Sequence, residues 1–193
     1  MFGKNIFIIS GPSGVGEDSV ISGLKKYFDM ERIITTTTRP KRAGETQGNP
    51  YYFISQKEFK KKIENGLMAE YAQEYNHNFY GVTKEELERV DKSQKLGIWK
   101  IEYTGVMTAK KKFPGIKSIY LTVSSPEILR KRILKRDPFE SEVYLRERME
   151  YTREWMKHEN IYDYKVVNEE GKLDKTIKKI ADIIKRNLDD QSH

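Results

Sequence analysis

Cysteine is absent from the 193-residue chain, and histidine occurs only three times. Without cysteine, a disulfide framework, a thiol nucleophile and a zinc–cysteine site are all excluded, and the three histidines show no metal-ligand spacing. The N-terminal MFGKNIFIIS holds one apolar run of strand length, too short for a signal-peptide core or a membrane span. We therefore expect a soluble, cytoplasmic protein with no membrane partner.

Positive charge is in excess, with 36 lysines and arginines against 29 acidic residues and a formal charge of +7. This balance favours anionic partners such as nucleotides and nucleic acids. The lysines are spread over many segments, however, and no nucleic-acid recognition motif is present, so nucleic-acid binding is the poorer interpretation. The length fits one compact domain with small inserted subdomains.

Strand and helix patterns alternate along the chain. An apolar strand at 5–10 leads through a glycine-rich turn into a helix at 18–28, and residues 35–53 read as an irregular segment before 51–53. Further strands are expected at 67–75, 79–83, 96–101, 118–123 and 164–167, and further helices at 56–65, 84–92, 104–112, 126–136, 142–157 and 173–188. This alternation predicts an α/β fold whose parallel sheet has helices on both faces.

The run GPSGVGEDSV, residues 11–20, is close to a phosphate-binding loop. Such a loop reads G-x-x-x-x-G-K-[ST], where the lysine neutralises phosphates and the hydroxyl binds Mg²⁺. Gly11 and Gly16 are in register, but Glu17 and Asp18 stand where lysine and serine or threonine are expected. The candidate nucleotide-binding residues of this loop are Gly11, Ser13, Gly14, Val15, Gly16, Glu17, Asp18 and Ser19.

Several separated stretches, in the same order, make the chain resemble the guanylate kinases along nearly its whole length. They are GPSGVG, TTTTRPKRAGE with the following Tyr51-Tyr52-Phe53, EYAQEYNHNFYG, IEYTGV, RKRILKR, RERM and VVN. The resemblance implies a P-loop NTPase-type core, a small mixed subdomain that binds the nucleoside monophosphate, and a helical lid. The expected bounds are 1–34, 84–125 and 150–193 for the core, 35–83 for the subdomain and 126–149 for the lid.

For the acceptor nucleotide, the resemblance implies that two arginines and two tyrosines bind the phosphate, namely Arg39, Arg42, Tyr51 and Tyr80. The side-chain chemistry agrees, since guanidinium groups match phosphate oxygens in pairs and a phenol donates one hydrogen bond. Solvated loop cations and core aromatics are the alternative for any one of them alone.

The guanine base is expected to meet Glu70 and Thr35, which match a carboxylate and a hydroxyl of the family. A second family hydroxyl falls on Val82, which cannot form a hydrogen bond. One extra residue around 75–78 indicates a rebuilt loop, so Thr83 or an asparagine can substitute. Because selectivity depends on paired groups, this loss predicts relaxed base selectivity.

On the ATP side, the resemblance implies that Arg132, Arg136 and Arg148 are lid arginines that close over the donor phosphates. Asn168 matches a residue that contacts adenine. The alternatives are a solvated basic helix surface for the arginines and a simple turn residue for Asn168.

A second departure from the family lies at 100–102, where an expected D-x-D reads Lys100-Ile101-Glu102. Glu102 keeps the carboxylate that faces the acceptor, whereas Lys100 replaces the acidic residue that helps to hold Mg²⁺. A charge exchange between neighbouring elements accounts for both departures. Lys100 would then reach the phosphates, Asp18 would bind the metal, and Glu17 would orient Lys100 or assist the metal through water.

The sequence thus predicts ATP- and Mg²⁺-dependent phosphorylation of GMP or dGMP by a monomer or homodimer. Two alternatives stay open: an inactive nucleotide-binding or scaffold module that keeps the fold, and a related kinase for a ribose phosphate. Simple decay predicts scattered losses and gives no reason for a lysine at the partner position, where burying it unpaired is costly.

Overall fold

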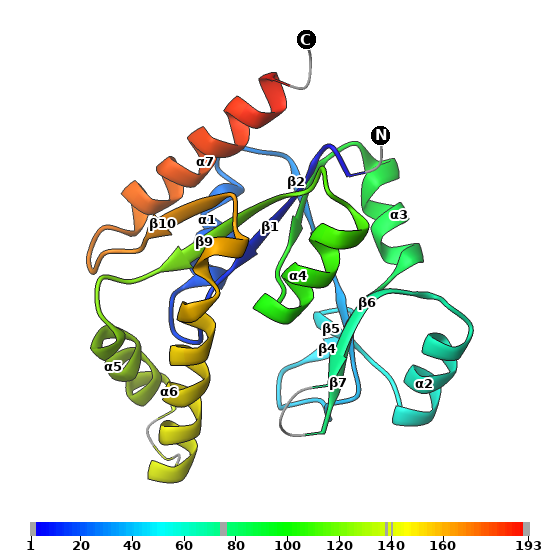
Figure 1. The fold of residues 1–193 in the computed structure, drawn as a ribbon, viewed down its shortest axis with the longest axis horizontal. Helices are drawn as coiled ribbons and strands as arrows, with labels where there is room; N and C mark the ends of the chain where they lie inside the picture. The colour runs from blue at the N-terminus through cyan, green and yellow to red at the C-terminus, as the bar shows by residue number, and fades with distance from the viewer. Residues whose placement is uncertain (1–2, 74–76, 138, 140, 191–193) are drawn as a thin grey trace.

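A computed structural model describes residues 3–73, 77–137, 139 and 141–190, which form two five-stranded sheets with helices around them (Figure 1). In the first sheet all pairs are parallel and the order is β10-β9-β1-β8-β2. Its strands are β1 (Ile6–Ser10), β2 (Met30–Ile33), β8 (Leu96–Trp99), β9 (Lys117–Thr122) and β10 (Tyr164–Val167).

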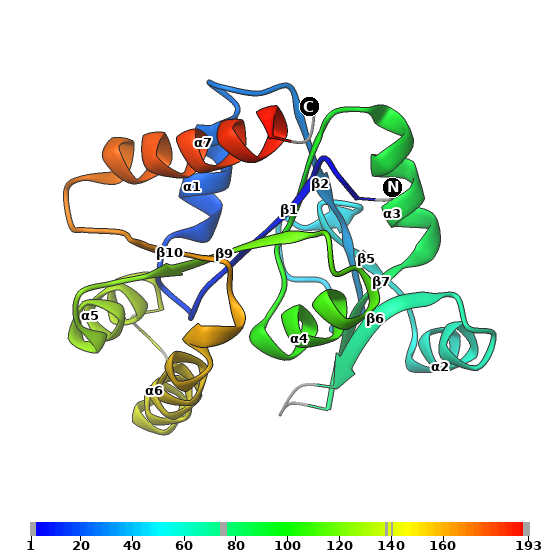
Figure 2. The same ribbon diagram turned by 45° about the horizontal axis from the view of Figure 1, so that its top comes forward.

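Helices cover both faces of this first sheet (Figure 2). They are α1 (Glu17–Leu24) and α7 (Leu173–Asp189) on one face, and α3 (Lys84–Ser93) and α4 (Tyr103–Lys112) on the other. Helices α5 (Pro126–Arg136) and α6 (Glu142–Lys157) lie beside the sheet, and a short 3-10 turn, η1 (Glu159–Ile161), follows α6. Helices α1 and α7 share one hydrophobic cluster with the sheet, and α3 and α4 share a second one. The predicted α/β fold with a parallel sheet is confirmed.

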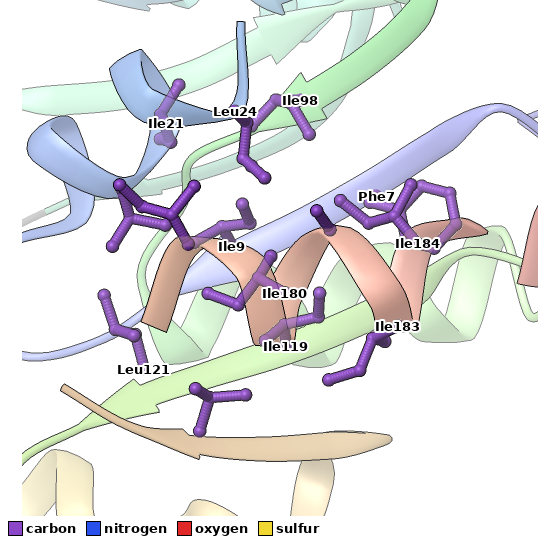
Figure 3. Packing of buried hydrophobic residues seen from close by; sticks show 14 of the residues in the cluster. Phe7, Ile9, Ile21, Leu24, Ile98, Ile119, Leu121, Ile180, Ile183 and Ile184 are labelled. Atoms are coloured by element: carbon purple, nitrogen blue, oxygen red, sulfur yellow. The ribbon is translucent and has the colours of Figure 1, made fainter. Parts of the chain in front are cut away.

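Alternation along β1 explains how one strand supports both faces. Phe7 and Ile9 belong to the cluster with α1 and α7, whereas Ile6 and Ile8 belong to the cluster with α3 and α4. Because successive side chains of a strand point to opposite faces, a strand covered on both sides needs a continuous apolar run. Figure 3 shows the first cluster, in which residues of α7 such as Ile180 lie over the strands.

The pairing register brings the carboxyl ends of three strands to one edge of the first sheet. Ile8 of β1 and Ile33 of β2 are both aligned with Trp99 of β8. The loop after β1, the residue after Trp99 and the end of β2 therefore lie side by side. Strand β1 has its neighbours β8 and β9 on opposite sides, and ligands of open α/β sheets bind at such a point.

The second sheet has the order β4-β5-β3-β7-β6 and mixes parallel with antiparallel pairs. Its strands are β3 (Thr35–Thr37), β4 (Thr46–Gln47), β5 (Pro50–Phe53), β6 (Met68–Gln73) and β7 (Phe79–Thr83), with helix α2 (Gln56–Glu64) beside it. Phe59 of α2 stacks on Phe79 with 5.3 Å between ring centroids. Mixed pairing agrees with the fold expected for this part of the chain.

Three sequence predictions of local structure are wrong. Residues 35–53 were expected to be irregular before 51, yet they contain β3, β4 and the start of β5, and β2 was not predicted. These strands carry polar side chains without apolar alternation, and they form because neighbouring strands complete their hydrogen bonds. The helix expected at 18–28 ends at Leu24, after which the chain continues in tight turns through Tyr27.

Helices α5 and α6 pack against each other through Ile133, Leu145 and Met149. Ser125 and Ser141 stand directly before the two helices, and each hydroxyl accepts a hydrogen bond from a first-turn amide, as helix N-caps do. Both helices have their predicted bounds.

Of the helices in the described ranges, none has the length and apolar character needed to cross a membrane.

A substitution at the contact between α1 and α7 would test how closely the first hydrophobic cluster is packed. A Cβ added at Gly23 would lie 2.2 Å from Ile177 Cδ1. We expect Gly23→Ala to lower the free energy of unfolding by about 1–3 kcal/mol, because overpacking in a buried contact outweighs the better helix propensity of alanine. Urea unfolding would measure the change.

Ser22→Ala, on the exposed side of the same helix, is the matched control and should change stability by less than about 0.5 kcal/mol. Adding Ile177→Val to Gly23→Ala should recover part of the loss. A Gly23→Ala protein as stable as the parent would contradict the close packing described for α1 and α7.

Candidate active site

The loop between β1 and α1 has the backbone shape that phosphate binding requires. At Gly11 a Cβ would lie 2.2 Å from the Leu121 carbonyl oxygen, so no larger residue fits there. Gly16 has φ 98°, a left-handed conformation that favours glycine, and it starts α1 without a side-chain cap. The first-turn amides of α1 are thus directed to the loop, as in anion-binding helix N-termini.

Asn168 supports this loop from the protein side. Its Nδ2 donates to the Val15 carbonyl at 2.8 Å, and its Oδ1 accepts from the Thr176 hydroxyl at 3.1 Å. The side chain is 5% exposed. Both ends of the amide therefore have partners inside the protein, and they fix the position of Val15. A contact between Asn168 and adenine stays a prediction.

An ion cluster joins the start of α1 to the ends of β8 and β2. Lys100 Nζ lies 2.8 Å from Asp18 Oδ2 and 3.6 Å from Glu17 Oε2. Arg32 Nη2 lies 3.1 Å from Asp18 Oδ1, so each oxygen of this carboxylate has its own cation. Lys100 was predicted to lie beside Glu17 and Asp18, and it does. Arg32 was not predicted, because no phosphate-loop motif includes it.

Burial and charge set the protonation of this cluster. Burial raises the pKa of Glu17 to about 7, and the nearby Lys100 limits the rise. Burial would also raise the pKa of Asp18, but Lys100 and Arg32 together hold that pKa below its usual range. Burial would lower the pKa of Lys100, and the carboxylates of Glu17 and Asp18 instead hold it above its usual range. Lys100 therefore stays positively charged.

A second charged group lies in the loop between β3 and β4 of the second sheet. Arg39 Nη2 and Nη1 bond Glu45 Oε1 and Oε2 at 2.8 and 3.0 Å, and the Arg42 backbone N–H donates to Glu45 Oε2 at 2.7 Å. The Arg39 guanidinium lies 5.4 Å from the ring centroid of Tyr51, whose ring meets that of Tyr80 edge-on at 6.0 Å. Arg39, Tyr51 and Tyr80 are thus brought together as predicted.

Glu45 is a residue that sequence reasoning missed. Hydrogen bonds from Arg39 and from the Arg42 backbone hold the pKa of Glu45 at about 2, so it is a carboxylate at neutral pH. The side chains of Arg39 and Glu45 are 12% and 16% exposed. The signal was present in the run RPKRAGE, where an acidic residue follows two arginines at turn-forming spacing.

Comparison with known proteins assigns the family. A family model described as guanylate kinase matches residues 3–187. The chain belongs to the guanylate kinase family. The guanylate kinase of Buchnera aphidicola subsp. Schizaphis graminum is 37% identical over 168 residues, which cover 86% of this chain and 80% of that relative. The guanylate kinase of Caldanaerobacter subterraneus subsp. tengcongensis is 36% identical over 181 residues, covering 93% and 85%.

A solved structure supports the same assignment. The crystal structure of guanylate kinase from Anaplasma phagocytophilum matches with a TM-score of 0.71 and 25% identity, covering 95% of this chain and 85% of that one. Members of the guanylate kinase family are nucleoside monophosphate kinases, so the enzyme class expected from the sequence is confirmed.

Within this guanylate kinase fold, two of the predicted acidic site residues, Glu70 and Glu102, are close enough for their charges to interact. Glu70 of β6 is 3% exposed, and its Oε2 lies against Gly105 of α4, where a Cβ would be 3.1 Å away. Burial raises the pKa of Glu70 to about 8, with Lys112 opposing and Glu102 adding to the rise. Glu102 accepts a hydrogen bond from the Tyr151 hydroxyl.

The remaining base-side candidates have different positions. Thr35 is 9% exposed on β3, opposite Tyr51 in the sheet. Val82 is fully buried in the second hydrophobic cluster, and the Thr83 hydroxyl accepts the Glu86 amide as the N-cap of α3. The proposed insertion includes Tyr75 and Asn76, which lie outside the described residues.

Two of the three arginines that are predicted to belong to a lid contact the loop between β1 and α1. Arg132 Nη1 donates to the Val15 and Gly14 carbonyls at 3.2 and 3.4 Å, and Arg136 Nη2 lies 3.5 Å from Ser13 Oγ. Arg148 lies on α6, with its guanidinium 5.1 Å from the ring centroid of Tyr144. Arg136 also pairs with Asp137, and the positive charge of Arg148 lowers the pKa of that same carboxyl, so the two arginines share a neighbourhood.

The acidic residues at the phosphate loop suit a metal ion that takes some of its ligands from the protein and the others from bound phosphates. Among the described residues no group of three or more His, Asp or Glu side chains forms a metal cage. Asp18 is 65% exposed beside the loop, and Ser19 next to it is also exposed. Mg²⁺ is commonly held by one or two carboxylates together with substrate phosphates, so the donor chemistry of Asp18 fits this ion.

The raised pKa of Glu70 predicts a pH effect on stability. Between pH 4.5 and about 8 the folded protein keeps a proton on Glu70 that the unfolded chain releases, so stability falls as pH rises through this window. Glu70→Gln removes this titration. We expect the variant to gain stability relative to the parent from pH 5 to pH 9, by on the order of 2–4 kcal/mol.

Urea unfolding of both proteins at pH 5, 7 and 9 would measure this difference. Glu64→Gln, at an exposed position on α2, is the control and should show no such trend. A difference between Glu70→Gln and the parent that does not change with pH would show that Glu70 is already ionised in the folded protein.

Proposed function

We propose that this chain transfers a phosphoryl group from ATP to GMP or dGMP, with Lys100 replacing the missing lysine of the phosphate loop. Membership of the guanylate kinase family supports the reaction class. The observation that carries the Lys100 assignment is its contact with both acidic residues of the loop, at 2.8 Å from Asp18 and 3.6 Å from Glu17. A cation is thus available at the loop, although it comes from another strand.

On the donor side, we propose that Lys100 leaves Asp18 for the ATP phosphates. Its side chain is 29% exposed and that of Asp18 is 65% exposed, so water can solvate the Asp18 carboxylate when Lys100 leaves it. Glu17 orients Lys100 from its other side. The loop amides bind phosphate oxygens, and Asn168 holds the loop in shape and lies toward the adenine side.

On the acceptor side, we propose that Arg39 exchanges its bond to Glu45 for a bond to the GMP phosphate. The guanidinium already presents a pair of N–H groups to a planar anion, and a phosphate offers the same geometry. Arg42, Tyr51 and Tyr80 complete the phosphate site, and the residues assigned to the base and its neighbourhood are Thr35, Glu70 and Glu102.

In the transfer step, a phosphate oxygen of GMP forms a bond to the γ-phosphorus of ATP while the bond from that phosphorus to the bridging oxygen of ADP breaks. Arg39 positions the attacking phosphate. Negative charge spreads over the transferred group, and catalysis comes from positioning and from cations around it. Those cations are assigned to Lys100, Arg132, Arg136 and Arg148.

We assign Asp18 as the residue that holds Mg²⁺, with Glu17 assisting through water. The ion, when bound, neutralises phosphate charge and orients the β- and γ-phosphates. Departure of Lys100 from Asp18 frees Oδ2 for this purpose. Asp18 thereby takes the place of the serine or threonine hydroxyl that normally stands in this position.

We further propose that residues 35–83 act as the subdomain for the monophosphate and residues 126–149 as the lid, around a core formed by 1–34, 84–125 and 150–193. Two observations support this division: helices α5 and α6 have a small cluster of their own, and the second sheet has its own strand order. The subdomain is nevertheless joined to the core, because Ala69 and Val82 pack in the second hydrophobic cluster.

Replacing Lys100 tests the proposed function. We expect Lys100→Ala to lower kcat for GMP phosphorylation by at least about 100-fold, because a cation at the developing charge is lost. A coupled assay of ADP release would measure it. Lys95→Ala, at the opposite end of β8 and 41% exposed, is the matched control and should keep parental activity.

The charge exchange is tested by restoring the residue types that a typical phosphate loop and its neighbouring strand carry at these positions. In a Lys100→Asp background, Glu17→Lys together with Asp18→Ser should restore activity, and Glu17→Lys alone should restore less. Full activity of Lys100→Ala would contradict the assignment of Lys100.

The acceptor is tested in the same assay with GMP, dGMP, AMP, CMP, UMP and ribose phosphates. We expect turnover with GMP or dGMP. Measurable GMP binding without turnover of any acceptor would instead identify a nucleotide-binding module, and turnover with a ribose phosphate alone would identify the related kinase.

A further inference from the structure

Arg32 is an unassigned cation at the proposed phosphate site. It lies near the end of β2, where Arg32 is aligned with Ile98 of the neighbouring strand β8, two residues before Lys100. This register places the side chains of Arg32 and Lys100 at the same edge of the sheet. Arg32 Nη2 reaches Asp18 Oδ1 at 3.1 Å, while Lys100 Nζ reaches Asp18 Oδ2 at 2.8 Å.

Two cations therefore share one carboxylate. The side chains of Arg32, Lys100 and Asp18 are 39%, 29% and 65% exposed, so Asp18 keeps its contact with water whichever cation leaves it. When one cation leaves Asp18, the other still neutralises it. Without Arg32, Asp18 would depend on Lys100 alone, and Lys100 would be held more firmly away from any ligand.

We propose that Arg32 is a positioning residue for ATP: it keeps Asp18 oriented and neutralised while Lys100 moves from Asp18 to the nucleotide phosphates. This inference rests on the proposed function in one respect, that the ligand of the loop is ATP. Arg32 acts through Asp18 and Lys100 and does not itself contact the phosphates. The arrangement is specific to a chain that has aspartate at the second position of the helix.

The geometry of Arg32 supports an indirect role. Its guanidinium is paired with Asp18 Oδ1, and its backbone carbonyl accepts a hydrogen bond from Arg89 Nη2 at 3.3 Å, which ties this part of β2 to α3. Arg89 itself is paired with Glu86 and Glu31. The backbone at Arg32 is therefore held by α3, and its side chain extends to Asp18.

A double-mutant cycle separates the indirect role from a direct one. The probe is a fluorescent ATP analogue, titrated in EDTA so that binding is measured without metal and without turnover. We expect Arg32→Gln to weaken binding about fivefold in the parent, the size of one exposed ion-pair exchange. In an Asp18→Asn background Lys100 has already lost its pairing with Asp18, so the same change should alter affinity by less than about twofold.

Two further variants serve as controls. Arg32→Lys should recover parental affinity within about twofold, because an ammonium can still neutralise Asp18. Lys25→Gln removes the same charge at the far end of α1, where the side chain is exposed, and should change affinity by less than about twofold. Arg32→Met retains the aliphatic part of the side chain and should repeat the loss if Arg32→Gln does not fold.

Equal weakening in both backgrounds would overturn the proposal, because it would show that Arg32 contacts the phosphates directly. No weakening in the parent background would overturn it as well and make Arg32 a bystander. Parent protein that does not bind the ATP analogue would contradict both this inference and the proposed function. Parent protein that binds the analogue and shows the expected cycle, but has no kinase activity, would contradict the proposed function alone.

Discussion

The ion pair between Lys100 and Asp18 is the interaction on which the interpretation of this site depends. It joins the residue after β8 to the first turn of α1. Within the protein itself, the lysine neutralises the acidic side chain that follows the phosphate loop. Parallel pairing of β1, β8 and β2 makes it possible, because their carboxyl ends share one edge of the sheet. A lysine and an acidic residue can therefore exchange chain positions and remain neighbours.

The same arrangement recurs elsewhere in the molecule. Arg39 is held by Glu45 and Arg136 by Asp137, so cations assigned to both nucleotides are paired with carboxylates of the protein. The Arg136–Asp137 pair, 54% and 23% exposed, is of the kind that contributes little net stability, whereas Arg39 and Glu45 are only 12% and 16% exposed. A more buried pair is harder to separate. Partial exposure of the ion pairs at the proposed donor site thus agrees with the proposal that they open when nucleotide binds.

Much of the fold could be predicted from the sequence, because its strongest patterns are local. Strand 164–167 and helices 126–136 and 142–157 have the predicted bounds, since apolar spacing and serine caps act within a few residues. The strands within 30–53 could not be predicted. Their side chains are largely polar and without a regular apolar pattern, and their hydrogen bonds come from partners such as β7 and β8, which lie far along the chain.

For the site, the sequence by itself indicated the phosphate-loop glycines, the arginines and tyrosines that are predicted to bind the acceptor, and the paired departures at Glu17, Asp18 and Lys100. Their order along the chain was sufficient to indicate the family. Only the tertiary structure decided that Glu45 holds Arg39, that Asn168 supports the loop, and that Arg32 shares Asp18 with Lys100. The last two of these contacts join segments that are far apart along the chain and that the pairing of strands brings together. No local pattern in a single sequence shows which side chains that pairing makes neighbours.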